Sequence, residues 1–162
     1  MTSVAITGHR GLAADTLALV DRALRWEAAL RIRPGESELI GVSCLADGPD
    51  SLFAQAVLDA GGRLIAVVPA RRYRASLPAE HHAVYDRLLA AAARVIELDR
   101  EHSDPEAHQA GSLRMLDEAA ELLAVWDGRP ARGYGGTADV VSTARERGMP
   151  VTVLWPDGAE RP

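Results

Sequence analysis

Short apolar runs alternate with helical segments along the chain, and this alternation constrains the fold more than any other feature. The runs have the length of buried strands and cover residues 3–7, 39–43, 64–68, 94–98, 122–126 and 151–155. Helical patterns lie between them, such as residues 49–60, where Pro49 suits the first helical position and Gly61 the stop. Strands that alternate with helices predict an α/β protein with a mainly parallel sheet and right-handed crossovers.

The length and composition are those of one ordinary globular domain. A chain of 162 residues with 48% hydrophobic and 25% charged residues can bury a substantial core. We expect a single domain over residues 1–156 and a flexible tail over 157–162. The single Cys44 fits a reducing compartment, and no apolar run reaches membrane-spanning length, so we expect a cytoplasmic protein without a membrane partner.

The charged residues indicate which kinds of molecule the protein can bind. The net charge is −5, so the surface as a whole should repel nucleic acid, and we expect no nucleic-acid partner. All 18 basic residues are arginine, so any cationic recognition of phosphate depends on the forked donors of guanidinium groups.

A glycine-rich stretch after the apolar run at 122–126 predicts an anion site. The loop carries Asp127, Arg129 and Arg132, and its glycines are Gly128, Gly133, Gly135 and Gly136. Thr137 is a suitable N-cap for the following helix, and Asp139 falls in its first turn. A strand, a glycine-rich loop and a helix N-terminus present backbone N–H groups to a phosphate. The alternative is a capped helix without a ligand.

The other loops rich in Gly, Asp and Arg also follow predicted strands. Arg10 comes after the first strand together with Gly8, and Asp47, Gly48 and Asp50 come after the second. Ligands on parallel sheets bind at the carboxyl ends of the strands, so we expect Arg10, Asp50 and Thr137 to converge on one ligand. Arg10 would hold a phosphate or carboxylate, and Asp50 a sugar hydroxyl or a water molecule. A surface arginine and a helix-capping aspartate are the alternatives.

The histidines and the cysteine give little sign of metal or thiol chemistry. His81 and His82 are adjacent and point in different directions on a helix, and no Cys/His spacing is that of a zinc site. His9 has no carboxylate near it in sequence, so a packing or hydrogen-bonding role is expected. We expect no metal and no fixed cofactor beyond a nucleotide ligand.

Three parts of the sequence resemble the SLOG superfamily of nucleotide-binding, Rossmann-like domains, especially its YpsA-like group and the DNA-processing protein A domain. They are residues 4–10 (VAITGHR), residues 41–50 (GVSCLADGPD) with 61–67 (GGRLIAV), and residues 125–128 (VWDG) with 133–141 (GYGGTADVV). The resemblance implies a Rossmann-like, doubly wound, mainly parallel sheet with helices on both faces. It also implies a nucleotide or nucleotide-derived ligand, and self-association as a dimer.

The superfamily includes the Lonely Guy phosphoribohydrolases, which cleave the N-glycosidic bond of nucleoside monophosphates. Their motif P-G-G-x-G-T-x-x-E matches here at Gly133, Gly136 and Thr137. The position of the catalytic glutamate is Val140, and Asp139 lies one residue too early. Two functions therefore stay open. A nucleotide-binding protein is the first, and the alternative is a small N-glycosidic or phosphate-ester hydrolase with Asp47, Asp50 or Asp139 as its carboxylate.

Overall fold

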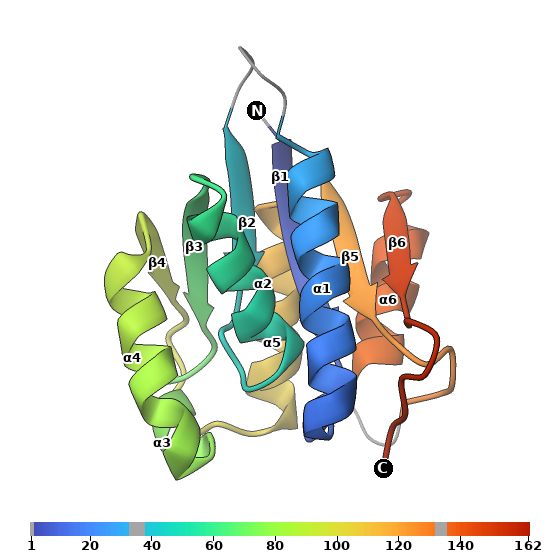
Figure 1. The fold of residues 1–162 in the computed structure, drawn as a ribbon. Coiled ribbons are helices and arrows are strands. Elements are labelled where there is room, and N and C mark those ends of the chain that lie inside the picture. Colours follow the sequence, from blue (N-terminus) through green and yellow to red (C-terminus); the bar gives the residue numbers. More distant parts are fainter. Residues whose placement is uncertain (1, 33–37, 132–135) are drawn as a thin grey trace.

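The computed structural model describes residues 2–32, 38–131 and 136–162. Figure 1 shows one sheet with helices packed on both of its faces. The strands are β1 (Thr2–Gly8), β2 (Leu39–Ser43), β3 (Arg63–Val68), β4 (Arg94–Glu97), β5 (Glu121–Val125) and β6 (Val151–Leu154). The helices are α1 (Ala14–Leu30), α2 (Pro49–Asp59), α3 (Tyr73–Ser76), the 3₁₀ turn η1 (Ala79–His81), α4 (His82–Ala91), α5 (Pro105–Asp117) and α6 (Thr137–Glu146).

Over the residues described, the sheet has six strands in the order β4-β3-β2-β1-β5-β6, and every neighbouring pair is parallel. Helices α1, α2 and α4 cover one face, and α5 and α6 cover the other (Figure 1). The prediction of a doubly wound α/β fold is confirmed, and the sheet is entirely rather than mainly parallel.

The central strands are buried on both faces, which explains their continuous apolar sequences. Along β1, Val4 and Ile6 pack in one core cluster with residues of α1 and α2, whereas Ala5 belongs to the other cluster with residues of α5 and α6. This is the two-residue period of a strand that lies between two layers of helices. Within the described ranges, no helix is long and apolar enough to cross a lipid bilayer.

β1 lies between β2 on one side and β5 on the other. The strands that follow β1 in the chain are first added on the β2 side and then on the β5 side, so the strand order reverses beside β1. A crevice forms at such a switch point beyond the carboxyl ends of the strands. Gly8 ends β1 here, and a Cβ added to it would lie 2.7 Å from Cβ of Pro49 at the start of α2. A glycine at this position lets α2 pack directly against the end of β1.

The N-cap residues of two helices differ from those that the sequence suggested. The N-cap of α6 is Gly136 and Thr137 is the first helical residue, so the prediction of Thr137 as the cap is wrong by one position. The N-cap of α2 is Gly48, with a φ of 91°, and neither Asp47 nor Asp50 caps that helix. The positive φ at position 48 therefore requires a glycine, because residues with a side chain disfavour this backbone conformation.

The last residues make specific contacts, in contrast to the expected flexible tail. The backbone N of Glu160 donates to Oγ1 of Thr16 at 3.0 Å, and that hydroxyl lies 3.3 Å from the Glu160 carbonyl oxygen. These contacts tie the segment after β6 to the first turns of α1.

Candidate functional site

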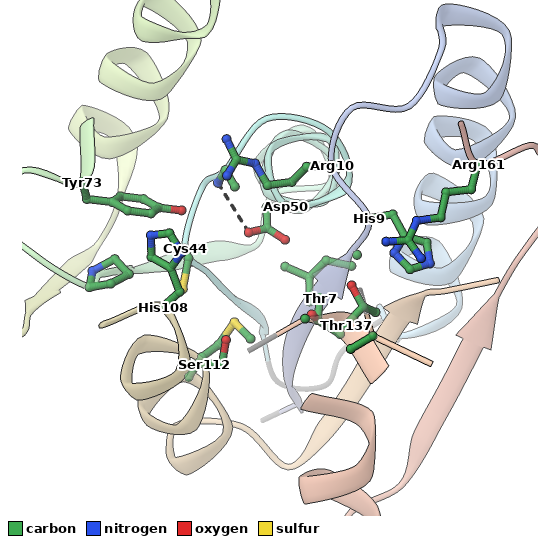
Figure 2. Close-up of a pocket in the computed structure, with 17 residues that line it drawn as sticks. Thr7, His9, Arg10, Cys44, Asp50, Tyr73, His108, Ser112, Thr137 and Arg161 are labelled. Carbon is green, nitrogen blue, oxygen red and sulfur yellow. Dashed lines mark hydrogen bonds between the residues drawn. The ribbon is translucent and has the colours of Figure 1, made fainter. Parts of the chain in front are cut away.

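A cavity of about 290 Å³ lies at the carboxyl ends of the strands, beside the point where the strand order reverses (Figure 2). Its walls come from the end of β1, the loops after β1, β2, β3 and β5, the start of α2, helices α3 and α5, the start of α6 and the segment after β6. The residues that line it include Thr7, Arg10, Asp50, Tyr73, His108, Thr137 and Arg161.

Arg10 enters the cavity from the loop after β1 and is held by Asp47. Its Nε donates to Oδ1 of Asp47 at 2.8 Å, and a terminal guanidinium nitrogen lies 2.6 Å from the same oxygen. The arginine side chain is 43% exposed, so the pair contributes little to stability. Its main effect is to orient the guanidinium at the cavity.

Asp50 is the carboxylate that lines the cavity. It is half-buried in the first turn of α2, and its Oδ2 accepts the N–H of Ala46 at 3.4 Å. Burial raises the pKa of Asp50 to about 7, although the Ala46 N–H and the charge of Arg10 act in the opposite direction. A carboxyl group that titrates near neutral pH can hold or release a proton inside the cavity.

Buried polar side chains support the loop that carries Asp47 and leads to Asp50 in α2. Leu45 has a φ of 60°, a backbone conformation that is uncommon for a residue with a side chain. Oγ of Ser43 accepts the Leu45 N–H at 3.0 Å, and Oγ of Ser51 donates to the Ala46 carbonyl at 2.7 Å. Nε2 of His81 lies 3.0 Å from the Leu45 carbonyl oxygen and 3.1 Å from Oγ of Ser51. The buried Ser51–His81 pair therefore supports the loop.

The start of α6 forms the opposite wall. Gly136 and Thr137 line the cavity, and Thr137 is buried. The first N–H groups of an α-helix have no partner within the helix, and the helix dipole favours negative charge there. The start of α6 therefore offers donors to an anion.

His9 and Asp127 join the ends of β1 and β5. Nε2 of His9 lies 3.2 Å from Oδ1 and 3.1 Å from the backbone N of Asp127, so the ring nitrogen accepts the N–H or, when protonated, donates to the carboxylate. Burial alone would raise the pKa of Asp127, but the Arg129 N–H and the His9 ring bring it below the usual value. The His9 ring also packs edge-on against Trp155, with ring centroids 5.8 Å apart.

The other end of the cavity is aromatic. Tyr73 is buried and meets the His108 ring edge-on, with ring centroids 5.8 Å apart. Nε2 of His108 lies 2.7 Å from Oγ of Ser103, and burial lowers the pKa of His108, as does the charge of Arg10. The imidazole and the phenol ring give this end of the cavity an aromatic surface.

The structure brings together the residues that the topology placed at one sheet edge. Gly8, Arg10, Asp50, Gly136 and Thr137 all line the cavity. Their binding to a ligand stays a prediction.

The other predicted site residues lie elsewhere. Asp47 pairs with Arg10, Gly48 caps α2 and Asp127 bonds to His9, so these three support the lining residues rather than line the cavity. Gly133 and Gly135 lie outside the described residues.

Some lining residues were not singled out in the sequence. Thr7 ends β1, and the same rule about strand ends would have found it. His108 and Ser112 come from α5, and Arg161 comes from the segment expected to be a flexible tail. No local motif marks these three, because only the folded chain brings them to the cavity. Within the part of the chain that the structure describes, no three His, Cys, Asp or Glu side chains gather as a metal site would require.

No protein-family model and no curated protein sequence matches the chain. Solved structures do match. DNA processing protein A from Helicobacter pylori has a TM-score of 0.69 at 15% identity, over 98% of this chain and 68% of that one. The same protein from Streptococcus pneumoniae has a TM-score of 0.68 at 19% identity, over 98% of this chain and 52% of that one. The chain thus spans about half the length of the S. pneumoniae protein.

Two further structures share the fold. TM1055 has a TM-score of 0.59 at 17% identity, over 93% of this chain and 72% of that one. The Moco carrier protein of Chlamydomonas rheinhardtii has a TM-score of 0.53 at 16% identity, over 94% of this chain and 75% of that one.

These matches correct the expectation about nucleic acid. The H. pylori DNA processing protein A binds single-stranded DNA. A protein of this fold can therefore have a nucleic-acid partner, and the expectation against one, drawn from the net charge, was wrong. The comparisons agree with the fold that the sequence resemblance implied: the chain shares the parallel, Rossmann-like fold of these structures.

Proposed function

We propose that the cavity binds a nucleotide or a nucleotide-derived ligand. The observation that supports this proposal most is the difference in chemistry between the two ends of the cavity. Thr7, Thr137 and Arg161 lie at one end and Tyr73 and His108 at the other (Figure 2). A phosphate needs cations, hydroxyls and N–H donors, and a base needs aromatic and apolar surface.

Asp50 and Arg10 lie between these two ends (Figure 2). A ribose that joins base to phosphate would meet them, and a carboxylate oxygen accepts hydrogen bonds from ribose hydroxyls. The order phosphate, sugar and base along a nucleotide therefore corresponds to the order of side chains along the cavity.

A calorimetric titration with AMP, adenosine and ribose 5-phosphate tests this function. We expect AMP to bind more tightly than either fragment, because only AMP occupies both ends. Ser112→Trp places a large side chain in the cavity wall and should abolish binding. Ser142→Trp, at an exposed position of α6, is the matched control and should bind as the wild type does. The function is wrong if the wild type binds none of the three compounds, or if Ser112→Trp binds AMP normally.

A short single-stranded oligonucleotide belongs in the same titration, because a protein of this fold binds single-stranded DNA. It carries the same base and phosphate chemistry as AMP. Tight binding of the oligonucleotide that Ser112→Trp abolishes, together with weak binding of AMP, would make a strand of nucleic acid the ligand of this cavity.

Hydrolysis of the N-glycosidic bond is the second candidate function, and the pKa of about 7 for Asp50 favours it. A protonated carboxyl group can donate to the departing base while water attacks the sugar, which releases the base and ribose 5-phosphate from a nucleoside monophosphate. The residue in the position of the Lonely Guy glutamate is Val140, and the carboxyl group would come from Asp50, the acidic residue among the described residues that line the cavity. Release of adenine from AMP that is lost in Asp50→Asn would establish this activity, and intact AMP after prolonged incubation would exclude it.

A further inference from the structure

The segment after β6 returns to the cavity and is held along its length. It leaves Leu154 at the end of the strand and places Trp155 edge-on against His9. It then meets α1, where Glu160 exchanges hydrogen bonds with the Thr16 hydroxyl. The C-terminal end therefore lies beside the start of α1, at the same edge of the sheet as the cavity (Figure 1).

These contacts place Arg161 in the cavity wall. Its side chain is 17% exposed, and a terminal guanidinium nitrogen lies 3.7 Å from Oδ2 of Asp127. That distance is an ion pair but exceeds the range of a hydrogen bond. The other carboxylate oxygen, Oδ1, accepts the Arg129 N–H at 3.0 Å and faces His9 at 3.2 Å. Asp127 is thus fixed from one side and attracts Arg161 from the other.

Among the described residues that line the cavity, the arginines are Arg10 and Arg161, and they differ in how firmly a carboxylate holds them. Arg10 is in hydrogen-bonding contact with Asp47 through two of its nitrogens, at 2.6 and 2.8 Å. Arg161 has the longer contact of 3.7 Å to Asp127. An incoming anion can take up hydrogen bonds from Arg161 without first breaking one to Asp127, so Arg161 is the cation better placed to bind it.

We propose that Arg161 binds the phosphate group of the ligand, and that Asp127, oriented by His9, positions its guanidinium. This proposal rests on the proposed nucleotide-binding function and adds a residue to it. The phosphate would lie between Arg161 and the start of α6, since the cavity wall contains both Arg161 and Thr137. The ligand recognised is a phosphate monoester of a nucleoside, and the nucleoside without phosphate gains nothing from Arg161.

Calorimetry with AMP and adenosine tests this role on the wild type, Arg161→Ala and Arg161→Lys. Loss of a charge-assisted hydrogen bond typically weakens binding roughly ten- to a hundredfold. We expect Arg161→Ala to weaken AMP binding by that factor and to leave adenosine binding unchanged. Arg161→Lys should retain part of the AMP affinity. Arg147→Ala is the matched control, since Arg147 is an exposed arginine paired with Asp117 at the other end of α6.

Each result decides the proposal. Equal weakening of AMP and adenosine in Arg161→Ala would mean that the segment only covers the cavity, and would overturn the role in phosphate binding. Unchanged AMP binding in Arg161→Ala would also overturn it while leaving the nucleotide-binding function intact. A wild type that binds neither compound would reject the nucleotide-binding function itself and this proposal with it.

Discussion

Nε2 of His9 lies 3.2 Å from Oδ1 of Asp127, although the two residues are 118 positions apart in the chain. The contact joins the ends of β1 and β5, the neighbouring strands beside which the order of the sheet reverses. It also connects the cavity to the segment after β6, because His9 packs against Trp155 and Asp127 faces Arg161. His9, which has no carboxylate near it in sequence, therefore links the parts of the site through hydrogen bonding and ring packing.

The first prediction is that His9→Ala destabilises the fold. The change leaves the backbone N–H of Asp127 without its acceptor, removes the contact of the ring with the Asp127 carboxylate and removes the ring contact with Trp155, so the free energy of unfolding should fall by about 2–4 kcal/mol. Urea unfolding measures it. His102→Ala, at an exposed position, is the control and should change little. Equal stability of the two variants would show that the His9–Asp127 contact contributes nothing to the fold.

The second prediction concerns the close packing of β1 against α2. In Gly8→Ala the new Cβ would lie 2.7 Å from Cβ and 2.8 Å from Cγ of Pro49, so strand and helix must separate. Overpacking of this kind costs about 1–3 kcal/mol. Gly11→Asn is the control, because a Cβ there meets nothing within 4 Å and asparagine tolerates the positive φ. A thermal melt in which Gly8→Ala is as stable as the control would contradict the packing argument.

The third prediction follows from the pKa of Asp50, which burial raises from 3.8 to about 7. Below about pH 4 the carboxyl group is protonated in the folded and the unfolded chain, and its contribution to stability is fully present. As the pH rises toward 7 the unfolded chain releases this proton more readily, so that stability is lost. The loss is at most about 4 kcal/mol, since one pKa unit corresponds to about 1.4 kcal/mol.

Asp50→Asn isolates this contribution, because the amide has the same shape and does not titrate. The variant should gain stability relative to the wild type between about pH 4 and pH 8, as measured by urea unfolding across that range. A constant difference between the two proteins over the range would show that Asp50 titrates normally.

The fourth prediction links Arg10 to Asp50. The charge of Arg10 lowers the pKa of Asp50, against the larger effect of burial, so Arg10→Ala should raise that pKa further. An NMR titration of the Asp50 side-chain carboxyl carbon would report it directly. Arg63→Ala removes an exposed arginine that is paired with Glu38 and serves as the control. A downward shift in Arg10→Ala would contradict the electrostatic description of the cavity.

Much of the fold could be predicted because each strand is a continuous apolar run. The run at 39–43 is β2 without any change of boundary, and the one at 122–126 differs from β5 by one residue at each end. The cap of α6 was misjudged because Gly136 and Thr137 suit the N-cap position about equally well.

The site could be predicted only where the topology alone places a residue. Arg10, Asp50 and Thr137 follow from the rule that ligands bind at the carboxyl ends of parallel strands. His108 and Arg161 do not, because one lies on the helix that crosses behind the sheet and the other on a segment without regular structure. Dimer formation and cytoplasmic localisation stay predictions.

An NMR titration of the labelled protein with AMP tests most directly whether a nucleotide binds in this cavity. We expect the amide signals of Gly8, Asp50, Thr137 and Ala138 to shift in proportion to bound AMP, together with those near Tyr73. Signals of the edge strand β4, on the far side of the sheet from β6, should stay in place. Shifts confined to residues outside the cavity, or no shifts at millimolar AMP, would show that the cavity is not a nucleotide site.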